Sequence, residues 1–161
     1  MYYNFDQDLV EGKKGEETIQ AFLTRRFGGT LVFNNDTKSL DTLMHFSTPT
    51  PFGVGHISFE IKTDVLVSPQ RDTGNLFIEC QSRGKKSGIQ VCRADWFLYY
   101  LKHFDEVWCI RPVACLELIH TGRFRSVIGG DAGSGTLGVL LPKERVADSF
   151  LVFHEVSRGT E

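Results

Sequence analysis

The sequence lacks the features of a membrane, secreted or disulfide-stapled protein. None of its 161 residues belong to an apolar run of about 18, the length that a membrane-spanning helix needs. The opening stretch, Met1 to Asp6, has no basic and apolar regions of a signal peptide. The four cysteines, at positions 80, 92, 109 and 115, show neither a CxxC pair nor a Cys/His zinc spacing. We therefore expect a single domain over residues 1–161, with reduced thiols, in the cytoplasm and without a membrane partner.

The sequence also lacks an excess of positive charge. Its formal net charge is −2, whereas a protein that binds nucleic acid by electrostatics alone would be basic. A metal-dependent nuclease can be acidic, because bound cations offset its carboxylates. The glycine-rich residues 128–138 lack the Gly-Lys-Ser/Thr ending of a phosphate loop, so we interpret them as a surface loop.

The first expected element is a helix over residues 6–27. Ile19, Phe22, Leu23 and Phe27 recur at the spacing of a core-facing stripe, and Gly28 ends the pattern. Glu16 falls on the same row as this stripe. Its neighbour at position 17 falls on a polar row and should face water.

The rest of the chain predicts strands with few helices. Strands are expected over residues 31–33, 41–46, 56–64, 75–82, 107–110 and 151–156, with a loop over 47–55. A second helix is expected over 94–104, a short one after Pro112 and a helical turn after Pro142. This order predicts an α/β or α+β sandwich, in which helices pack on a mixed sheet.

The stretch from His56 to Asp64 alternates between apolar and polar residues. Positions 57, 59 and 61 are apolar and β-branched or aromatic, which is typical of a strand with one buried face. The other face carries Ser58, Glu60, Lys62 and Asp64. Two carboxylates and an ammonium group on one strand face make this the candidate site.

Other acids are expected to converge on that face. Folding the chain at residues 50 and 51 sets Asp41 opposite Glu60, at the short distance of cross-strand partners. The same argument at residues 69 and 70 sets Glu79 on the other side of Glu60. Glu16 would join them if the first helix packs over this face. Like charges this close are costly unless a cation lies between them, and Mg²⁺ or Mn²⁺ prefers such oxygen ligands.

This set of residues predicts phosphodiester hydrolysis. Asp41, Glu60 and the carbonyl of Ile61 would hold a divalent ion, which lowers the pKa of a bound water. Lys62 would orient or deprotonate that water, or stabilise the charge on the phosphorane. Glu16 would bind a second ion or a metal-bound water.

These residues resemble the PD-(D/E)XK nuclease superfamily. The likeness rests on a Gly-x-x-Gly-Glu helix ending at Glu16, on Asp41 at the start of a strand, and on Glu60-Ile61-Lys62 as the Glu-x-Lys pair. Their spacing is similar to that of archaeal-type Holliday-junction resolvases and of homing endonucleases with the same core. The later runs 73–79, 87–89 and 94–96 resemble phage-borne members of the superfamily.

The resemblance covers roughly residues 9–110 and leaves 111–161 as a C-terminal extension. It implies a restriction-endonuclease-like αβββαβ core and Mg²⁺-dependent DNA cleavage, in a bacterial or phage-infected cell. Leu40 stands where the motif usually has proline. The oligomeric state stays open, although a homodimer with twofold symmetry suits an enzyme that cuts both strands.

A second frame of the motif competes with the first. In it, Asp64 supplies the first acid, and Glu79 with Gln81 forms a Glu-x-Gln variant. We favour the first frame because its lysine, Lys62, is present and because its hairpin sets Asp41 opposite Glu60. In either frame Glu79 can serve as an accessory ligand.

Several basic residues follow the candidate strands. Arg83, Lys85, Lys86 and Arg93 are positioned to contact the phosphate backbone of DNA, although a solvated basic turn would look the same. His45 and His56 flank the predicted hairpin and are interpreted as ordinary polar residues. Trp96 and Tyr100 could stack on bases, but at helical spacing they are expected in the core.

The predicted function is a divalent-metal-dependent DNA endonuclease with a resolvase-like selectivity for DNA structure. An alternative is a nuclease-like fold that binds nucleic acid without cleaving it. A third option is a protein-interaction or virion component that uses the aromatic surface. Clustered carboxylates repel phosphate, so they favour a metal-dependent enzyme over a protein that only binds nucleic acid.

Overall fold

The computed structural model describes residues 5–33, 42–129 and 135–159. Its elements are α1 (Phe5–Phe27), β1 (Thr30–Leu31), β2 (Thr42–Thr50), β3 (Gly53–Asp64), β4 (Asn75–Ser82), β5 (Lys85–Lys86), β6 (Trp96–Leu101), β7 (Glu106–Ile110), α2 (Pro112–Thr121), β8 (Arg125–Gly129), β9 (Thr136–Pro142), α3 (Lys143–Val146) and β10 (Leu151–His154). Short 3-10 helices η1 (Pro69–Arg71), η2 (Gly88–Gln90), η3 (Lys102–Phe104) and η4 (Ala147–Ser149) connect them. The fold is α+β, with helices and a mixed sheet, as the sequence predicts.

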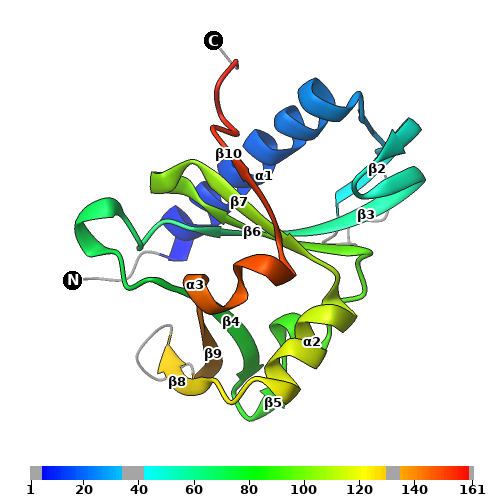
Figure 1. Cartoon of the computed structure of the whole chain (residues 1–161). Helices are drawn as coiled ribbons and strands as arrows, with labels where there is room; N and C mark the ends of the chain where they lie inside the picture. Colours follow the sequence, from blue (N-terminus) through cyan, green and yellow to red (C-terminus); the bar gives the residue numbers. More distant parts are fainter. Residues whose placement is uncertain (1–4, 34–41, 130–134, 160–161) are drawn as a thin grey trace.

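The strands form two sheets (Figure 1). A six-stranded sheet has the order β1-β2-β3-β6-β7-β10, and a four-stranded sheet has the order β5-β4-β9-β8. In the larger sheet only the pairing of β3 with β6 is parallel. A parallel neighbour requires a long crossover, and β4, β5 and η2 are part of this connection.

Helix α1 packs on one face of the six-stranded sheet. Its buried residues Ile19, Phe22 and Leu23 belong to the same apolar cluster as Phe59 of β3. The helix ends at Gly28, whose φ of 71° is the left-handed conformation that glycine adopts at no steric cost. The predicted helix of residues 6–27 is thereby confirmed.

The other face of the six-stranded sheet packs against the four-stranded sheet, α2 and α3. Leu76 of β4 and Leu141 of β9 cluster there with Phe97 and Tyr99 of β6, and Cys115 of α2 joins them. Burial raises the pKa of the Cys115 thiol to about 12. In the part of the chain that the structure describes, the four cysteines form no disulfide.

The predicted helix over residues 94–104 is wrong, because residues 96–101 form strand β6. All six of its residues are buried, and they alternate between the two clusters: Trp96, Leu98 and Tyr100 face α1, whereas Phe97, Tyr99 and Leu101 face the smaller sheet. A strand that is buried on both sides has no polar face. Its continuous apolar run therefore looks like a buried helix in the sequence.

The predicted loop over residues 47–55 is also wrong. Strand β2 runs to Thr50 and β3 starts at Gly53, so a tight turn joins them, with a register shift between Phe46 and Thr50. The Thr50 hydroxyl donates to the Gly53 carbonyl at 2.7 Å and accepts from the Phe52 amide at 3.1 Å. The Phe52 ring is 1% exposed and packs edge-on against Phe59. Proline and glycine in this stretch therefore mark a hairpin that an aromatic ring anchors.

The remaining predicted elements hold with shifted ends. The structure has β7, α2, α3 and β10 close to their predicted positions. The predicted glycine-rich loop over 128–138 is shorter, because β8 extends to Gly129 and β9 starts at Thr136. No helix in the described ranges is long and apolar enough to cross a membrane.

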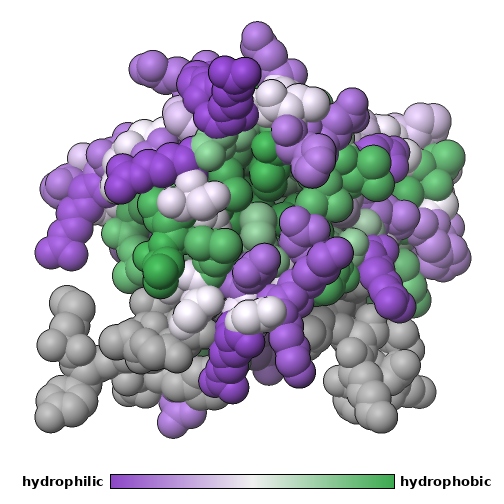
Figure 2. All heavy atoms as spheres, turned by 90° about the horizontal axis from the view of Figure 1, so that it is seen from below, coloured by the Kyte–Doolittle hydropathy of each residue, from purple (hydrophilic) through white to green (hydrophobic). Residues whose placement is uncertain are grey.

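Figure 2 shows the molecule from the side of α2, β5 and β8. Apolar side chains gather in the middle of this face and hydrophilic ones surround them. Two of the most exposed apolar side chains belong to these elements: Val113 of α2 is 76% exposed and Ile128 of β8 is 82% exposed. Apolar surface of this kind is typical of contact surfaces.

Candidate functional site

Glu60 and Lys62 lie on the face of β3 that points away from α1. Ile57, Phe59 and Ile61 belong to the apolar cluster under α1, and successive side chains of a strand point to opposite faces. Glu60 is half-buried and Lys62 is exposed. The alternation seen in the sequence therefore gives the correct orientation of both residues.

The pairing of β2 with β3 has the predicted register. Thr42 pairs with Phe59 and Leu43 with Ser58, so the residue numbers of each pair sum to 101, as they do for Asp41 and Glu60. The described strand begins at Thr42, and Asp41 itself lies outside the described residues. The predicted register of β2 and β3 is thus confirmed as far as Thr42, the residue next to Asp41.

Glu16 does not share the face of Glu60. Its carboxylate contacts the hydroxyl of Thr42, a buried residue opposite Phe59 on the α1 side of the sheet. Gln20, one turn further along α1, donates to the same hydroxyl at 3.1 Å. Burial raises the pKa of Glu16, and the hydrogen bond with Thr42 opposes that shift. The expectation of one shared face is therefore wrong for Glu16, which reaches the start of β2 from the opposite side.

A close approach between helix and strand sets this position. A Cβ atom built on Gly15 would lie 1.9 Å from Oγ1 of Thr63, a residue of β3 between Lys62 and Asp64. Only glycine lets α1 lie this near to the strand. The Gly-x-x-Gly-Glu pattern thus has a packing role at Gly15, next to Glu16.

Glu79 is not a strand neighbour of Glu60. Strand β4 belongs to the four-stranded sheet, where Glu79 pairs with Gly138, and the second neighbour of β3 is β6. The Glu79 carboxylate accepts a hydrogen bond from the Ser87 hydroxyl at 2.7 Å. The prediction of a β3–β4 hairpin is wrong because the chain leaves the first sheet after Asp64.

The rival frame places its residues in two sheets. Asp64 ends β3, and its Oδ1 accepts hydrogen bonds from the amides of Leu66 and Val67 at 2.9 and 3.1 Å. Its Oδ2 accepts from the Tyr99 hydroxyl at 2.6 Å. Burial, together with the Asp64 charge, raises the pKa of Tyr99. Asp64 therefore has a structural role in the turn after β3, whereas Gln81, the other member of this frame, is exposed on β4.

Three of the four basic residues that were predicted to contact DNA lie in the hairpin of β4 and β5. Arg83 and Gly84 have φ values of 52° and 74°, which is the type I′ turn that suits a two-residue hairpin between β4 and β5. Lys85 and Lys86 of β5 are exposed, as is Arg83. The basic turn is therefore a defined hairpin that presents three positive charges to solvent.

Arg93 lies two residues before a link between β6 and β3. The Asp95 carboxylate accepts hydrogen bonds from the amide and hydroxyl of Ser58, and the Ser58 hydroxyl accepts from the Asp95 amide at 2.9 Å. Ser58 and Glu60 are alternate residues on one face of β3. Arg93 itself is exposed in the segment that precedes this link. The Ser58–Asp95 link was not predicted, because residues 94–104 were expected to form a helix.

His45 and His56 also lie on this face. They are paired across β2 and β3, and their ring centroids are 4.8 Å apart. His56 precedes Glu60 by four residues, which is about 13 Å along a strand. The polar face of the hairpin therefore carries imidazoles at one end and Glu60 with Lys62 at the other.

The metal ligands predicted from the sequence are only partly described. Glu60 and the carbonyl of Ile61 lie on β3, whereas Asp41 lies outside the described ranges. Within those ranges no three His, Cys, Asp or Glu side chains gather as a metal site. One carboxylate and one carbonyl are oxygen ligands that suit Mg²⁺, but they need a further acid to hold it.

The chain was compared with protein-family models, with curated proteins and with solved structures, and no match was found in any of the three.

Proposed function

We propose that this protein is a divalent-metal-dependent DNA endonuclease of PD-(D/E)XK type. The observation that carries the proposal is the placement of Glu60 and Lys62, two residues apart on the polar face of β3, in a hairpin whose register continues toward Asp41. A carboxylate and an ammonium group in this relation suit a cleavage site for phosphodiesters.

The order of the elements supports the proposal. Helix α1 is followed by three antiparallel strands, β1, β2 and β3, and then by β6, which is parallel to β3. An αβββαβ core has this order, with a helix between the last two strands. In this chain β4, β5 and η2 stand between β3 and β6, where that core has a helix. We therefore propose the restriction-endonuclease-like core from the order and direction of the other elements.

Each residue has a distinct role in the proposed reaction. Asp41, Glu60 and the Ile61 carbonyl would hold Mg²⁺, which neutralises phosphate charge and lowers the pKa of a bound water. The exposed Lys62 would orient that water or stabilise charge on the reacting phosphate. Glu16 approaches β2 from the other side of the sheet and therefore has no role in the proposed reaction. Arg93 and the β4–β5 hairpin would contact the DNA backbone.

A nuclease assay tests the proposal directly. Supercoiled, linear, single-stranded and four-way-junction DNA are incubated with the protein and Mg²⁺ or Mn²⁺, or with a chelator. We expect metal-dependent cleavage, and a loss of roughly a hundredfold or more in Glu60→Gln and in Lys62→Met. Glu117→Gln on α2 and Lys14→Met on α1 are matched controls that should cleave normally, since both residues are exposed.

The outcome separates the proposal from its alternatives. Cleavage at the wild-type rate in Glu60→Gln and Lys62→Met would refute the assignment. Loss in Glu79→Gln instead would establish the rival frame. Asp64→Asn is a weaker test of that frame, because it also removes a carboxylate that accepts three hydrogen bonds. DNA binding without cleavage on any substrate would identify a binding protein.

A further inference from the structure

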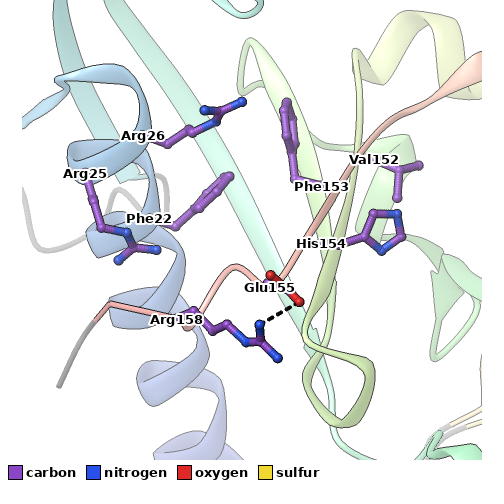
Figure 3. Close-up of a pocket in the computed structure, with 8 residues that line it drawn as sticks. All are labelled: Phe22, Arg25, Arg26, Val152, Phe153, His154, Glu155 and Arg158. Atoms are coloured by element: carbon purple, nitrogen blue, oxygen red, sulfur yellow. Dashed lines mark ion pairs between the residues drawn. The ribbon is translucent and has the colours of Figure 1, made fainter.

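A positively charged pocket lies between the end of α1 and the C-terminal segment (Figure 3). Its volume is about 440 Å³, within the range of small-molecule sites. Arg25 and Arg26 project from α1, and Arg158 projects from the segment after β10. The side chains of Phe22 and Phe153 also line it.

The charge of the pocket is not balanced by its lining. Glu155 is the single acid among its described lining residues, and Arg158 pairs with it at 2.8 Å. Three guanidinium groups and one carboxylate leave an excess of two positive charges. The whole chain carries a formal net charge of −2, so this excess is local. An excess of guanidinium groups in a concave site favours an anionic ligand.

The guanidinium groups retain donors for such a ligand. Arg25 donates from one nitrogen to the carbonyl of Val156 at 2.9 Å, and Arg158 uses one nitrogen on Glu155. A guanidinium group has five N–H donors, so each still has several. Arg26 lies 5.9 Å from the ring centroid of Phe27. The guanidinium group is planar, and its paired N–H donors match the spacing of the oxygens of a phosphate.

The wall that carries Arg158 is held in place. Val156 is fully buried, and its amide donates to the carbonyl of Asp105. The Asp105 carboxylate accepts hydrogen bonds from both the amide and the hydroxyl of Ser157. This segment is therefore fixed against the sheet, and the pocket is largely formed before a ligand arrives.

A simpler explanation accounts for only part of the pocket. Arg25 and Arg26 lie in the last turn of α1, where cations stabilise the negative end of the helix dipole. That effect does not require Arg158, which comes from another segment and lines the same pocket. Phe153, which is half-buried, also lines the pocket and adds an apolar surface beside the arginines.

We propose that this pocket binds the phosphate group of a nucleotide, either free or within a nucleic-acid strand. It lies on the α1 side of the six-stranded sheet, whereas Glu60 and Lys62 point to the other side. Strand β10 is three positions from β3, which is about 14 Å across the sheet. The pocket is thus separate from the cleavage site proposed above, and it does not depend on that function.

Calorimetric titration of the full chain tests the proposal, with inorganic phosphate, adenosine 5′-monophosphate and adenosine as probes. We expect the two phosphate-bearing probes to bind and adenosine to bind more weakly. Arg26→Ala and Arg158→Ala should each weaken the nucleotide by about tenfold or more, because each removes charge-assisted hydrogen bonds. Arg71→Ala, an exposed arginine on η1, is the matched control and should bind as the wild type does.

Short single-stranded DNA with and without a 5′-phosphate distinguishes the sources of the phosphate. Tighter binding of the phosphorylated strand, lost in Arg26→Ala, identifies a strand end, whereas equal binding identifies an internal phosphate. Binding of the mononucleotide alone identifies a free nucleotide. The proposal is refuted if neither phosphate nor nucleotide binds, if adenosine binds equally well, or if both arginine variants, folded by circular dichroism, bind as the wild type does.

Discussion

The contact between Gly15 and Thr63 leads to a sharp prediction about α1. Gly12 and Gly15 lie in the same helix, and replacing either with alanine removes the entropic cost of a glycine in a helix. That change alone stabilises a protein by about 1 kcal/mol. A Cβ atom at position 12 would meet no atom within 4 Å, whereas at position 15 it would lie 1.9 Å from Oγ1, 2.7 Å from Cγ2 and 2.8 Å from Cβ of Thr63.

The three distances decide whether Gly15→Ala stabilises or destabilises the protein. Rotation of the Thr63 side chain moves Oγ1 and Cγ2 but not Cβ, so the helix and strand must separate. Overpacking of this kind costs about 1–3 kcal/mol. The helical gain is common to both variants, so the difference between them isolates the clash. We expect Gly12→Ala to be stabilised and Gly15→Ala to be destabilised relative to it by about 1–3 kcal/mol.

Urea unfolding, followed by circular dichroism, measures both free energies of unfolding. The expected difference corresponds to a gap of roughly 2–12 °C in the thermal midpoints of a chain of this size. Thr63→Ala should partly rescue Gly15→Ala, because it removes the two shortest contacts and leaves the Cβ contact. The reasoning fails if Gly15→Ala and Gly12→Ala have equal stability, since α1 would then not approach β3 as described.

Three further predictions concern stability. Phe52→Ala should lower the free energy of unfolding by about 3–5 kcal/mol in urea titrations, because a fully buried ring is lost; a loss as small as that of exposed Pro51→Ala would contradict its anchoring role. Tyr99→Phe should cost about 1.5–3 kcal/mol at neutral pH, because the ionised Asp64 loses a 2.6 Å hydrogen bond; unchanged stability would show that this bond is not formed. The pKa of Glu16 is raised in the folded protein, so its stabilising effect is complete below the ordinary value of 4.5 and is lost as the pH rises through the folded value. Glu16→Gln should therefore be more stable than the wild type at pH 7 and equal to it at the acid end of a urea series, and a gap that stays constant with pH would refute the assignment.

Local patterns in the sequence were sufficient for much of the site. The alternation of β3 predicted which residues face the core, and the arrangement of the turn predicted the β2–β3 register. The apolar stripe of α1 predicted that Glu16 points with the core face and that Glu17 faces water; in the structure Glu16 is half-buried and Glu17 is exposed. These predictions held because each depends on the period of one element or on the length of one hairpin.

Properties that depend on distant segments were not accessible in this way. The sequence does not show that β3 has a parallel neighbour in β6, because the pairing is set by packing between segments over 30 residues apart. For the same reason Glu79 was placed beside Glu60 although β4 belongs to the other sheet. The side from which Glu16 approaches the sheet follows from where α1 packs, and the arginine pocket joins the end of α1 to residues 155–158.

The sequence by itself thus determined the helix α1, the hairpin of β2 and β3, and the orientation of Glu60 and Lys62. Periodicity and chain connectivity carry that information, because they act over a few residues. The tertiary structure alone decided the division into two sheets, the separation of Glu16 from the face of Glu60, and the pocket that Arg25, Arg26 and Arg158 line. These features arise where buried apolar faces choose their partners, and that choice depends on the packing of the whole chain.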